Sequence, residues 1–247
     1  MNEKYITSNI EFPSNQLRPG LITKGLSLPL SLKDYKLIAF DMDSTLINVE
    51  CIDEIADFVG LKKEVSTITK AAMRGEIRDY KDSLLQRVSL LKGVTLNQMN
   101  QVLMQRVKLN PGALNLVRAC QESGLKTLLV SGGFTYFSDH IKELLKLDFS
   151  RSNLLEIKDN ILTGKMLSQS WGNICDGDEK RTMLLETCAI LNIETSQCIA
   201  MGDGANDLPM MSIAGLSVAY HAKPTVREKA KIEINQGGLD SLLEVFS

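Results

Sequence analysis

The stretch Lys36–Glu50, KLIAFDMDSTLINVE, decides how the rest of the chain is interpreted. Its apolar run Leu37–Phe40 ends abruptly at a cluster of acidic and hydroxyl side chains that begins with Asp41. A short apolar run closed by charged residues is typical of a buried parallel strand that ends at a site. Ligands of open α/β sheets bind at the carboxyl ends of their strands, so we expect a site at residues 41–45.

Asp41 and Asp43 are the first candidates for chemistry. They are two residues apart, so in an extended backbone both carboxylates point the same way. Two adjacent negative charges repel each other unless a cation or a proton offsets them, which predicts bound Mg²⁺ with oxygen ligands. Manganese suits the same ligands. A simpler interpretation is a strand that ends in an Asp-rich turn, with Ser44 and Thr45 capping the next helix.

The composition narrows the class of protein. The 247 residues are enough for one large domain or a domain with an insertion, and 44% hydrophobic with 23% charged residues is ordinary for a globular protein. A net charge of −2 without a basic run predicts no nucleic-acid partner. No apolar run is long enough to span a bilayer, which predicts no membrane association. The N-terminus lacks an apolar signal core and the five Cys lack CxxC spacing, so we expect a cytoplasmic protein with reduced thiols.

The patterns of hydrophobicity divide the chain into three parts. Residues 1–34 contain several Pro and Gly that interrupt any period, which predicts an irregular N-terminal arm without an assigned function. Four helical segments with no strand between them fill residues 50–108 and predict an inserted helical cap. Strands and helices alternate in residues 35–49 and 109–247, which predicts an α/β core with a Rossmann-like parallel sheet.

Two further strands of this core also end in polar signatures. Lys126–Val130 runs into Ser131-Gly132-Gly133, and Gln197–Met201 runs into GDGANDLPMM. If these strands flank the first one in a parallel sheet, their signatures converge on a single site. Other expected elements are a small hairpin over Leu154–Leu167, short strands at Leu216–Tyr220 and Lys231–Ile234, and a C-terminal helix near Leu239–Val245.

The order of these signatures carries a family resemblance. DMDSTL, SGG, a lone Lys180 and GDGAND, in this order, resemble the motifs of the haloacid dehalogenase-like phosphatases. In the expected cap, VECIDEIADFVG, ITKAAMRGE and SLLQRVSLLKG are similar to the bacterial type of phosphoserine phosphatases. The resemblance covers about residues 36–240. It implies hydrolysis of O-phospho-L-serine to serine and phosphate, the last step of serine biosynthesis, by a monomer or homodimer.

The resemblance also implies roles for the acidic residues. Asp41 matches the nucleophile that forms an aspartyl-phosphate, and Asp43 matches the general acid and base. Mg²⁺ is expected to bridge Asp41, the backbone carbonyl of Asp43, and Asp203. Asp207 is expected to orient the outer shell of the metal with help from Asn206, although Asn206 also suits a helix N-cap.

Phosphate and substrate contacts follow from the same resemblance. Ser131 and the amide of Gly132 match the groups that hold phosphate oxygens, and Lys180 matches the cation beside the phosphoryl group. Glu50 matches the partner of the substrate ammonium, and Arg87 matches the partner of its carboxylate. Taken singly, the three charged residues would be ordinary surface or helix-end charges; together, in the order of the motifs, they favour a binding site.

Met73 and Tyr80 match the apolar wall of the substrate pocket, with Asp79 as an alternative to Tyr80. Three other functions remain open at this point. A phosphotransferase that passes the phosphoryl group to homoserine would use the same core, as would a phosphatase for another small phosphomonoester. A silent binding module would not need both aspartates of DMDST.

Overall fold

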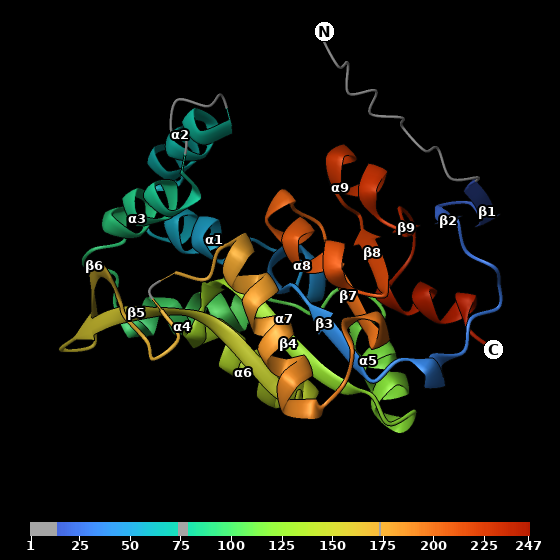
Figure 1. Cartoon of the computed structure of the whole chain (residues 1–247). Helices are drawn as coiled ribbons and strands as arrows, with labels where there is room; N and C mark the ends of the chain where they lie inside the picture. The colour runs from blue at the N-terminus through green and yellow to red at the C-terminus, as the bar shows by residue number, and fades with distance from the viewer. Residues whose placement is uncertain (1–13, 74–78, 173) are drawn as a thin grey trace, which may run out of the picture.

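The computed structural model describes residues 14–73, 79–172 and 174–247. Within them, nine strands form one sheet in the order β1-β2-β9-β8-β7-β3-β4-β5-β6 (Figure 1). Parallel pairing joins the six strands from β9 to β5, and the three remaining strands pair antiparallel at the two edges. The predicted α/β fold with a central parallel sheet is confirmed. The strands are β1 (Ser14–Arg18), β2 (Leu21–Lys24), β3 (Leu37–Phe40), β4 (Lys126–Phe134), β5 (Phe149–Lys158), β6 (Ile161–Leu167), β7 (Cys198–Gly202), β8 (Leu216–Tyr220) and β9 (Ile232–Ile234).

The central strand β3 is buried on both faces because helices cover both sides of the sheet. Ile38 and Phe40 point to one face, which α5 (Ala113–Glu122), α6 (Thr135–Leu145) and the 3₁₀ helix η5 (Leu239–Val245) cover. Leu37 and Ala39 point to the other face, which the remaining core helices cover. These are α7 (Gly177–Leu191), α8 (Leu208–Ile213) and α9 (Pro224–Lys229).

Four helices separate the loop after β3 from α5. Figure 1 shows α1, α2 and α3 gathered beside the carboxyl ends of the parallel strands. Glycines follow α1 and α3, at Gly60 and Gly93, and both have the positive φ that favours glycine at a helix end. The division of the chain into residues 35–49 and 109–247 as core and 50–108 as cap stays a prediction. The four helices are α1 (Cys51–Phe58), α2 (Lys62–Met73), α3 (Tyr80–Leu90) and α4 (Leu96–Gln105).

The prediction of an irregular arm over residues 1–34 is wrong for residues 14–24. There β1 and β2 form a hairpin, and β2 pairs antiparallel with β9 at the edge of the sheet. Pro19 and Gly20 lie at the turn, where Gly20 has a φ of +79°, so these residues connect strands instead of preventing them. Residues 1–13 lie outside the described residues.

The C-terminal segment Leu239–Val245 is a 3₁₀ helix, whereas the sequence predicts an ordinary helix. Leu239, Leu242 and Val245 are all buried. Their spacing of three residues matches three residues per turn, so the 3₁₀ form places all three side chains on the core face.

The expected hairpin over Leu154–Leu167 is formed by β5 and β6, with positive φ at Asp159 and Asn160 in the turn. Its attachment was not predicted. Leu162 of β6 donates its amide to Val94 O at 2.7 Å and accepts from Gly93 N at 2.9 Å. The segment between α3 and α4 is therefore hydrogen-bonded to the edge of the sheet.

Among the described residues, no helix combines the length and the apolar character needed to cross a membrane.

Candidate active site

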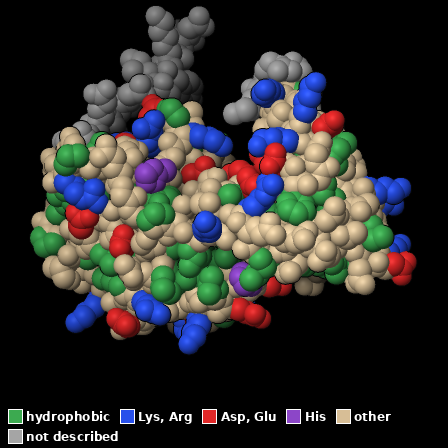
Figure 2. Space-filling model, turned by 180° about the vertical axis from the view of Figure 1, so that it is seen from behind, with side chains coloured by type: hydrophobic (Ala, Val, Ile, Leu, Met, Phe, Trp, Pro, Cys, Tyr) green, Lys and Arg blue, Asp and Glu red, His purple; other side chains and the backbone are tan. Residues whose placement is uncertain are grey.

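The carboxyl ends of β3, β4 and β7 meet below one cavity. Phe40, the last residue of β3, is paired with Leu129 of β4 and Met201 of β7, so the loop after β3, the SGG residues near the end of β4 and the loop after β7 are neighbours. The cavity has a volume of about 690 Å³. Figure 2 shows a hollow in this face of the molecule, with acidic and basic side chains around it. The residues that line the cavity include nine of those predicted from the sequence: Asp41, Asp43, Glu50, Tyr80, Arg87, Ser131, Gly132, Asp203 and Asn206.

Lys180 lies at the base of this site and is fully buried. Its Nζ donates to Asp41 Oδ1 at 2.5 Å and to Asp207 Oδ1 at 2.6 Å. Burial alone would lower the pKa of Lys180, but the carboxylates of Asp207 and Asp41 raise it well above its ordinary value. The side chain is therefore a fixed positive charge beside the predicted nucleophile.

Asp207 organises the loop after β7. Its Oδ2 accepts hydrogen bonds from the amides of Asp203 at 3.1 Å and Gly204 at 2.9 Å, and its Oδ1 accepts from Lys180. A Cβ at Gly202 would lie 2.3 Å from Asp207 Oδ2, so this position has room only for glycine. The spacing of GDGAND thus has a steric reason as well as a chemical one.

The donor set fits a hard divalent cation. One carboxylate oxygen each of Asp41, Asp203 and Asp207 lie within 4.8 Å of one another. Burial and the charge of Asp207 raise the pKa of Asp41 well above its ordinary value, and they raise the pKa of Asp203 to about 7. The negative charges of these carboxylates repel one another, and a cation with oxygen ligands would offset that repulsion. Both oxygens of Asp207 already accept hydrogen bonds, which favours Asp41 and Asp203 as direct ligands.

Asp43 lies in the wall of the same cavity, and its Oδ1 is buried without a hydrogen-bond partner in the described parts of the chain. Burial and the charge of Glu50 raise the pKa of Asp43 to about 8. A carboxyl group with this pKa is largely protonated at neutral pH and can donate a proton. A Cβ at Gly133 would lie 3.1 Å from Asp43 Oδ2, so the glycine leaves this carboxyl group room.

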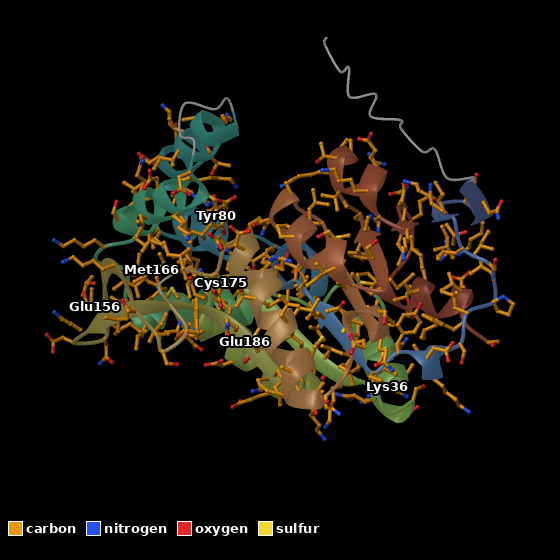
Figure 3. All side chains as sticks on the ribbon, viewed as in Figure 1. Lys36, Tyr80, Glu156, Met166, Cys175 and Glu186 are labelled. Atoms are coloured by element: carbon orange, nitrogen blue, oxygen red, sulfur yellow. The ribbon has the colours of Figure 1, made fainter. Side chains whose placement is uncertain are left out.

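The SGG segment forms a cradle between Asp43 and α3. Ser131 Oγ accepts a hydrogen bond from Gly133 N at 2.9 Å, so its own hydroxyl proton remains available to a ligand. A Cβ at Gly132 would lie 2.3 Å from the hydroxyl oxygen of Tyr80. Only glycine lets Tyr80 of α3 approach the core this closely. Figure 3 shows Tyr80 and Cys175 where α3 meets the segment before α7.

Two opposite charges reach the cavity from α3 and from the residue before α1. Glu50, just before α1, accepts a hydrogen bond from Ser44 Oγ at 2.7 Å. Arg87 of α3 lines the same cavity, and its Nε donates to Ser83 O at 3.3 Å. This places both charges where they can meet a small zwitterionic ligand.

The remaining predicted residues have different outcomes. Tyr80, which was predicted to form the pocket wall, and Asp79, its alternative, both line the cavity. Asn206 lines the cavity too, and its Oδ1 would lie 2.4 Å from a Cβ at Gly204, which shows that it folds back over its own loop. Met73 ends α2, and its side chain lies outside the described residues.

Sequence reasoning missed several residues of the site. Ser44, a helix cap in the simpler interpretation of the sequence, donates its hydroxyl to Glu50 and has a φ of +58°. Asp53 lines the cavity beside Arg87, and its Oδ1 has no hydrogen-bond partner within the described ranges. Lys223 also lines it, and its amide donates to Asp203 O at 3.0 Å. Of these three residues, only Ser44 could have been identified from the sequence, because it lies within the DMDST motif.

Comparison with known proteins defines the class. Residues 35–215 match the family described as haloacid dehalogenase-like hydrolase. The chain therefore belongs to the haloacid dehalogenase-like hydrolases, and the family resemblance in its motifs is confirmed.

The more particular likeness is to phosphoserine phosphatases. The chain is 64% identical over 230 residues to a phosphoserine phosphatase of Albidiferax ferrireducens, covering 93% of this chain and 97% of that protein. A solved haloacid dehalogenase family hydrolase of Salmonella enterica serovar Typhi has a TM-score of 0.81 and 40% identity, covering 89% of this chain and 73% of that one. A structure described as a phospho-aspartyl intermediate analogue of phosphoserine phosphatase has a TM-score of 0.78 and 38% identity, covering 86% and 99%.

Proposed function

We propose that this hydrolase is a cytoplasmic phosphoserine phosphatase of serine biosynthesis, which converts O-phospho-L-serine to serine and phosphate. The observation that carries the proposal is that a single cavity holds three groups of side chains. Asp41 and Asp43 supply the chemistry, the SGG cradle supplies the phosphate contacts, and two opposite charges come from the cap. Relatives at 64% identity carry the name phosphoserine phosphatase.

In the first step, the phosphoryl group lies between the Ser131 hydroxyl, the amide of Gly132 and the positive charge of Lys180. Lys180 holds Asp41 Oδ1, which leaves Oδ2 to attack the phosphorus atom. A bond forms between Oδ2 and phosphorus while the bond to the serine oxygen breaks. Asp43 donates its proton to that oxygen, so serine leaves as a neutral alcohol and Asp41 becomes an aspartyl-phosphate.

In the second step, the now ionised Asp43 accepts a proton from a water molecule. The water oxygen attacks phosphorus, and the bond to Asp41 Oδ2 breaks. Inorganic phosphate is released, Asp41 is a free carboxylate again and Asp43 is protonated again. The same carboxyl group thus acts as acid and then as base, which requires that it remain close to both oxygens.

Mg²⁺ would be held by Asp41, Asp203 and the backbone carbonyl of Asp43, and when bound it supplies positive charge that stabilises the phosphoryl oxygens. Asp207 does not bind the metal directly in this proposal. It positions Lys180 and the loop of Asp203 through hydrogen bonds.

Substrate selection lies in the cap. Glu50 pairs with the substrate ammonium, and Arg87 binds its carboxylate through the planar guanidinium. Tyr80 forms the wall against the core, and Met73 is the other wall residue. A substrate without the carboxylate or the ammonium leaves one of these charges without its partner.

The decisive experiment is inorganic phosphate release from O-phospho-L-serine with Mg²⁺, with and without a chelator, by the wild-type protein and Asp41→Asn. We expect rapid, chelator-sensitive release by the wild type and a loss of at least about 10³-fold in the variant, because an amide is a very poor nucleophile. Thermal unfolding checks that the variant is folded.

Comparison substrates separate the remaining alternatives. Phosphoethanolamine, phosphothreonine and an aryl phosphate are assayed beside phosphoserine, with and without homoserine as acceptor. Preference for the aryl phosphate would contradict the substrate assignment while keeping the catalytic core. Turnover only with homoserine would indicate a phosphotransferase, and no turnover at all would contradict catalysis.

A further inference from the structure

We infer that Asn153 is a positioning residue that fixes the phosphate cradle and ties it to the segment leading to Lys180. Asn153 lies on β5 and is fully buried. Its Nδ2 donates to Gly132 O at 2.8 Å, and its Oδ1 accepts from Cys175 N at 2.8 Å. The inference rests on the proposed function, because the phosphate-binding role of Ser131 and Gly132 belongs to that proposal.

The strand register explains why a side chain is needed here. β4 and β5 pair regularly up to Val130 and Arg151, and pairing resumes at Phe134 and Asn153. Three residues of β4 therefore lie opposite a single residue of β5, and Ser131–Gly133 bulges out of the ladder. Backbone groups in a bulge lose their hydrogen-bond partners on the neighbouring strand. The side-chain Nδ2 of Asn153 replaces one of these partners by donating to Gly132 O.

The contact with Gly132 O sets the direction of a whole peptide unit. In a planar trans peptide the C=O and the N–H point in opposite directions. Because Asn153 holds the C=O of Gly132, the N–H of Gly133 points the other way, where it donates to Ser131 Oγ at 2.9 Å. Asn153 thereby also orients the hydroxyl that faces the cavity.

The second contact of Asn153 joins the phosphate cradle to the helix that carries Lys180. Cys175, which binds Asn153 Oδ1, immediately precedes Asp176, the N-cap of α7. Lys180 lies in the first turns of α7 and reaches Asp41 from there. One buried amide thus couples the two segments that contact the phosphoryl group from different sides.

An asparagine is required by the chemistry of its two partners. Gly132 O needs a donor and the Cys175 amide needs an acceptor, and both requirements lie on one short side chain. An aspartate at this position would keep the acceptor but lose the donor, so Asn153→Asp breaks the contact with the cradle while leaving the Cys175 contact possible. A leucine of similar size would lose both.

The test compares Asn153→Asp with Ser152→Ala. Ser152 is the neighbouring buried residue on β5, and its hydroxyl contacts Ser138 Oγ at 2.6 Å and not the cradle. For Asn153→Asp we expect kcat to fall about 10- to 100-fold, by the same factor with phosphoserine and with an aryl phosphate, because the defect is at the phosphate end. Ser152→Ala is expected to keep kcat within about 2-fold.

A binding measurement adds a readout that does not depend on turnover. Titration calorimetry with inorganic phosphate and Mg²⁺ should show at least about 10-fold weaker binding by Asn153→Asp than by the wild type or Ser152→Ala. If Asn153→Asp does not fold, Asn153→Leu takes its place, since a side chain of similar size without polar atoms removes both contacts and fills the same space.

Three results would overturn the inference. These are a kcat of the Asn153 variant within about 2-fold of the wild type, phosphate affinity equal to that of Ser152→Ala, or a defect confined to KM for phosphoserine. Failure of the proposed function is distinguishable, because it is seen in the wild-type protein and leaves the phosphate-binding comparison between the variants valid.

Discussion

At the scale of single residues, burial changes what each charged side chain can do. Lys180 would be an ordinary surface lysine by its local sequence, yet it is fully buried between Asp41 and Asp207. A buried charge needs partners, and both of its partners belong to the site. The position and the charge of Lys180 therefore depend on Asp41 and Asp207.

Arg87 gives a prediction at this scale. We expect Arg87→Ala to lower kcat/KM for phosphoserine about 10- to 100-fold, since a charge-assisted hydrogen bond to a carboxylate contributes about 1.5–3 kcal/mol. Hydrolysis of an aryl phosphate should stay within about 2-fold, because that substrate has no carboxylate. Steady-state kinetics with both substrates measures the difference.

The matched control is Gln86→Ala, an exposed neighbour on α3. Gln86→Ala should leave kcat/KM for phosphoserine and for the aryl phosphate unchanged. An equal loss with phosphoserine and the aryl phosphate in Arg87→Ala would contradict the role of Arg87 in carboxylate binding.

At the scale of elements, polar side chains join strands and helices where the backbone pattern ends. Asp148 lies between α6 and β5, and its Oδ2 accepts from the amide and the hydroxyl of Thr127, each at 2.9 Å. Its Oδ1 accepts from Lys126 Nζ at 2.6 Å. Burial acts to raise the pKa of Asp148, but these hydrogen bonds together lower it by more, so the net shift is downward.

This shift predicts a pH-dependent contribution to stability. Since the folded-state pKa is below the unfolded value of about 3.9, Asp148 stabilises the fold above that pH and loses this effect as the pH falls through its folded-state pKa. Asp148→Asn should lower the free energy of unfolding by about 1–3 kcal/mol at pH 7 and by clearly less near pH 3. Urea unfolding at both pH values measures this.

Glu122→Gln, which alters an exposed carboxylate at the end of α5, serves as the control and should change stability little at either pH. A stability loss in Asp148→Asn that is the same at pH 7 and pH 3 would show that the charge of Asp148 is not its cause.

At the scale of the whole molecule, the segment that contains α1–α4 is hydrogen-bonded to the rest of the chain near both of its ends and at β6. Asn110 Nδ2 donates to Thr45 O at 2.8 Å and Ile47 O at 2.9 Å, which joins the segment before α1 to the segment after α4. In addition, Leu162 of β6 is hydrogen-bonded to Gly93 and Val94. Motion over the site is therefore expected in α1, α2 and the first part of α3, with α4 held in place.

Hydrogen exchange tests this expectation. Inorganic phosphate or phosphoserine with Mg²⁺ should slow amide exchange in α1 and in residues 80–87, because closure over the ligand excludes water and suppresses local opening. Exchange in α4 and in α9 should change little, and these helices are internal controls. Unchanged exchange in α1 and residues 80–87 with ligand bound would contradict closure of the cap.

The sequence by itself located the central strands β3, β4 and β7 and the polar residues next to their apolar runs, although β4 continues through SGG to Phe134. Asp41, Asp43, Ser131 and Asp203 follow short apolar runs, and a local pattern of this kind needs no knowledge of distant partners. The family was also evident, since DMDSTL, SGG and GDGAND occur in a fixed order. The hairpin of β1 and β2 was missed because its partner β9 lies more than 200 residues later.

Only the tertiary structure decided which distant groups meet. Lys180 contacts Asp41 across 139 residues, and Asn153 contacts Gly132 across 21. Such contacts depend on the order and register of strands, which are set by packing on both faces of the sheet and not by local propensity. Asn153 is a polar residue in a strand of mixed pattern, and nothing near it in the chain indicates that its amide completes a bulge of β4.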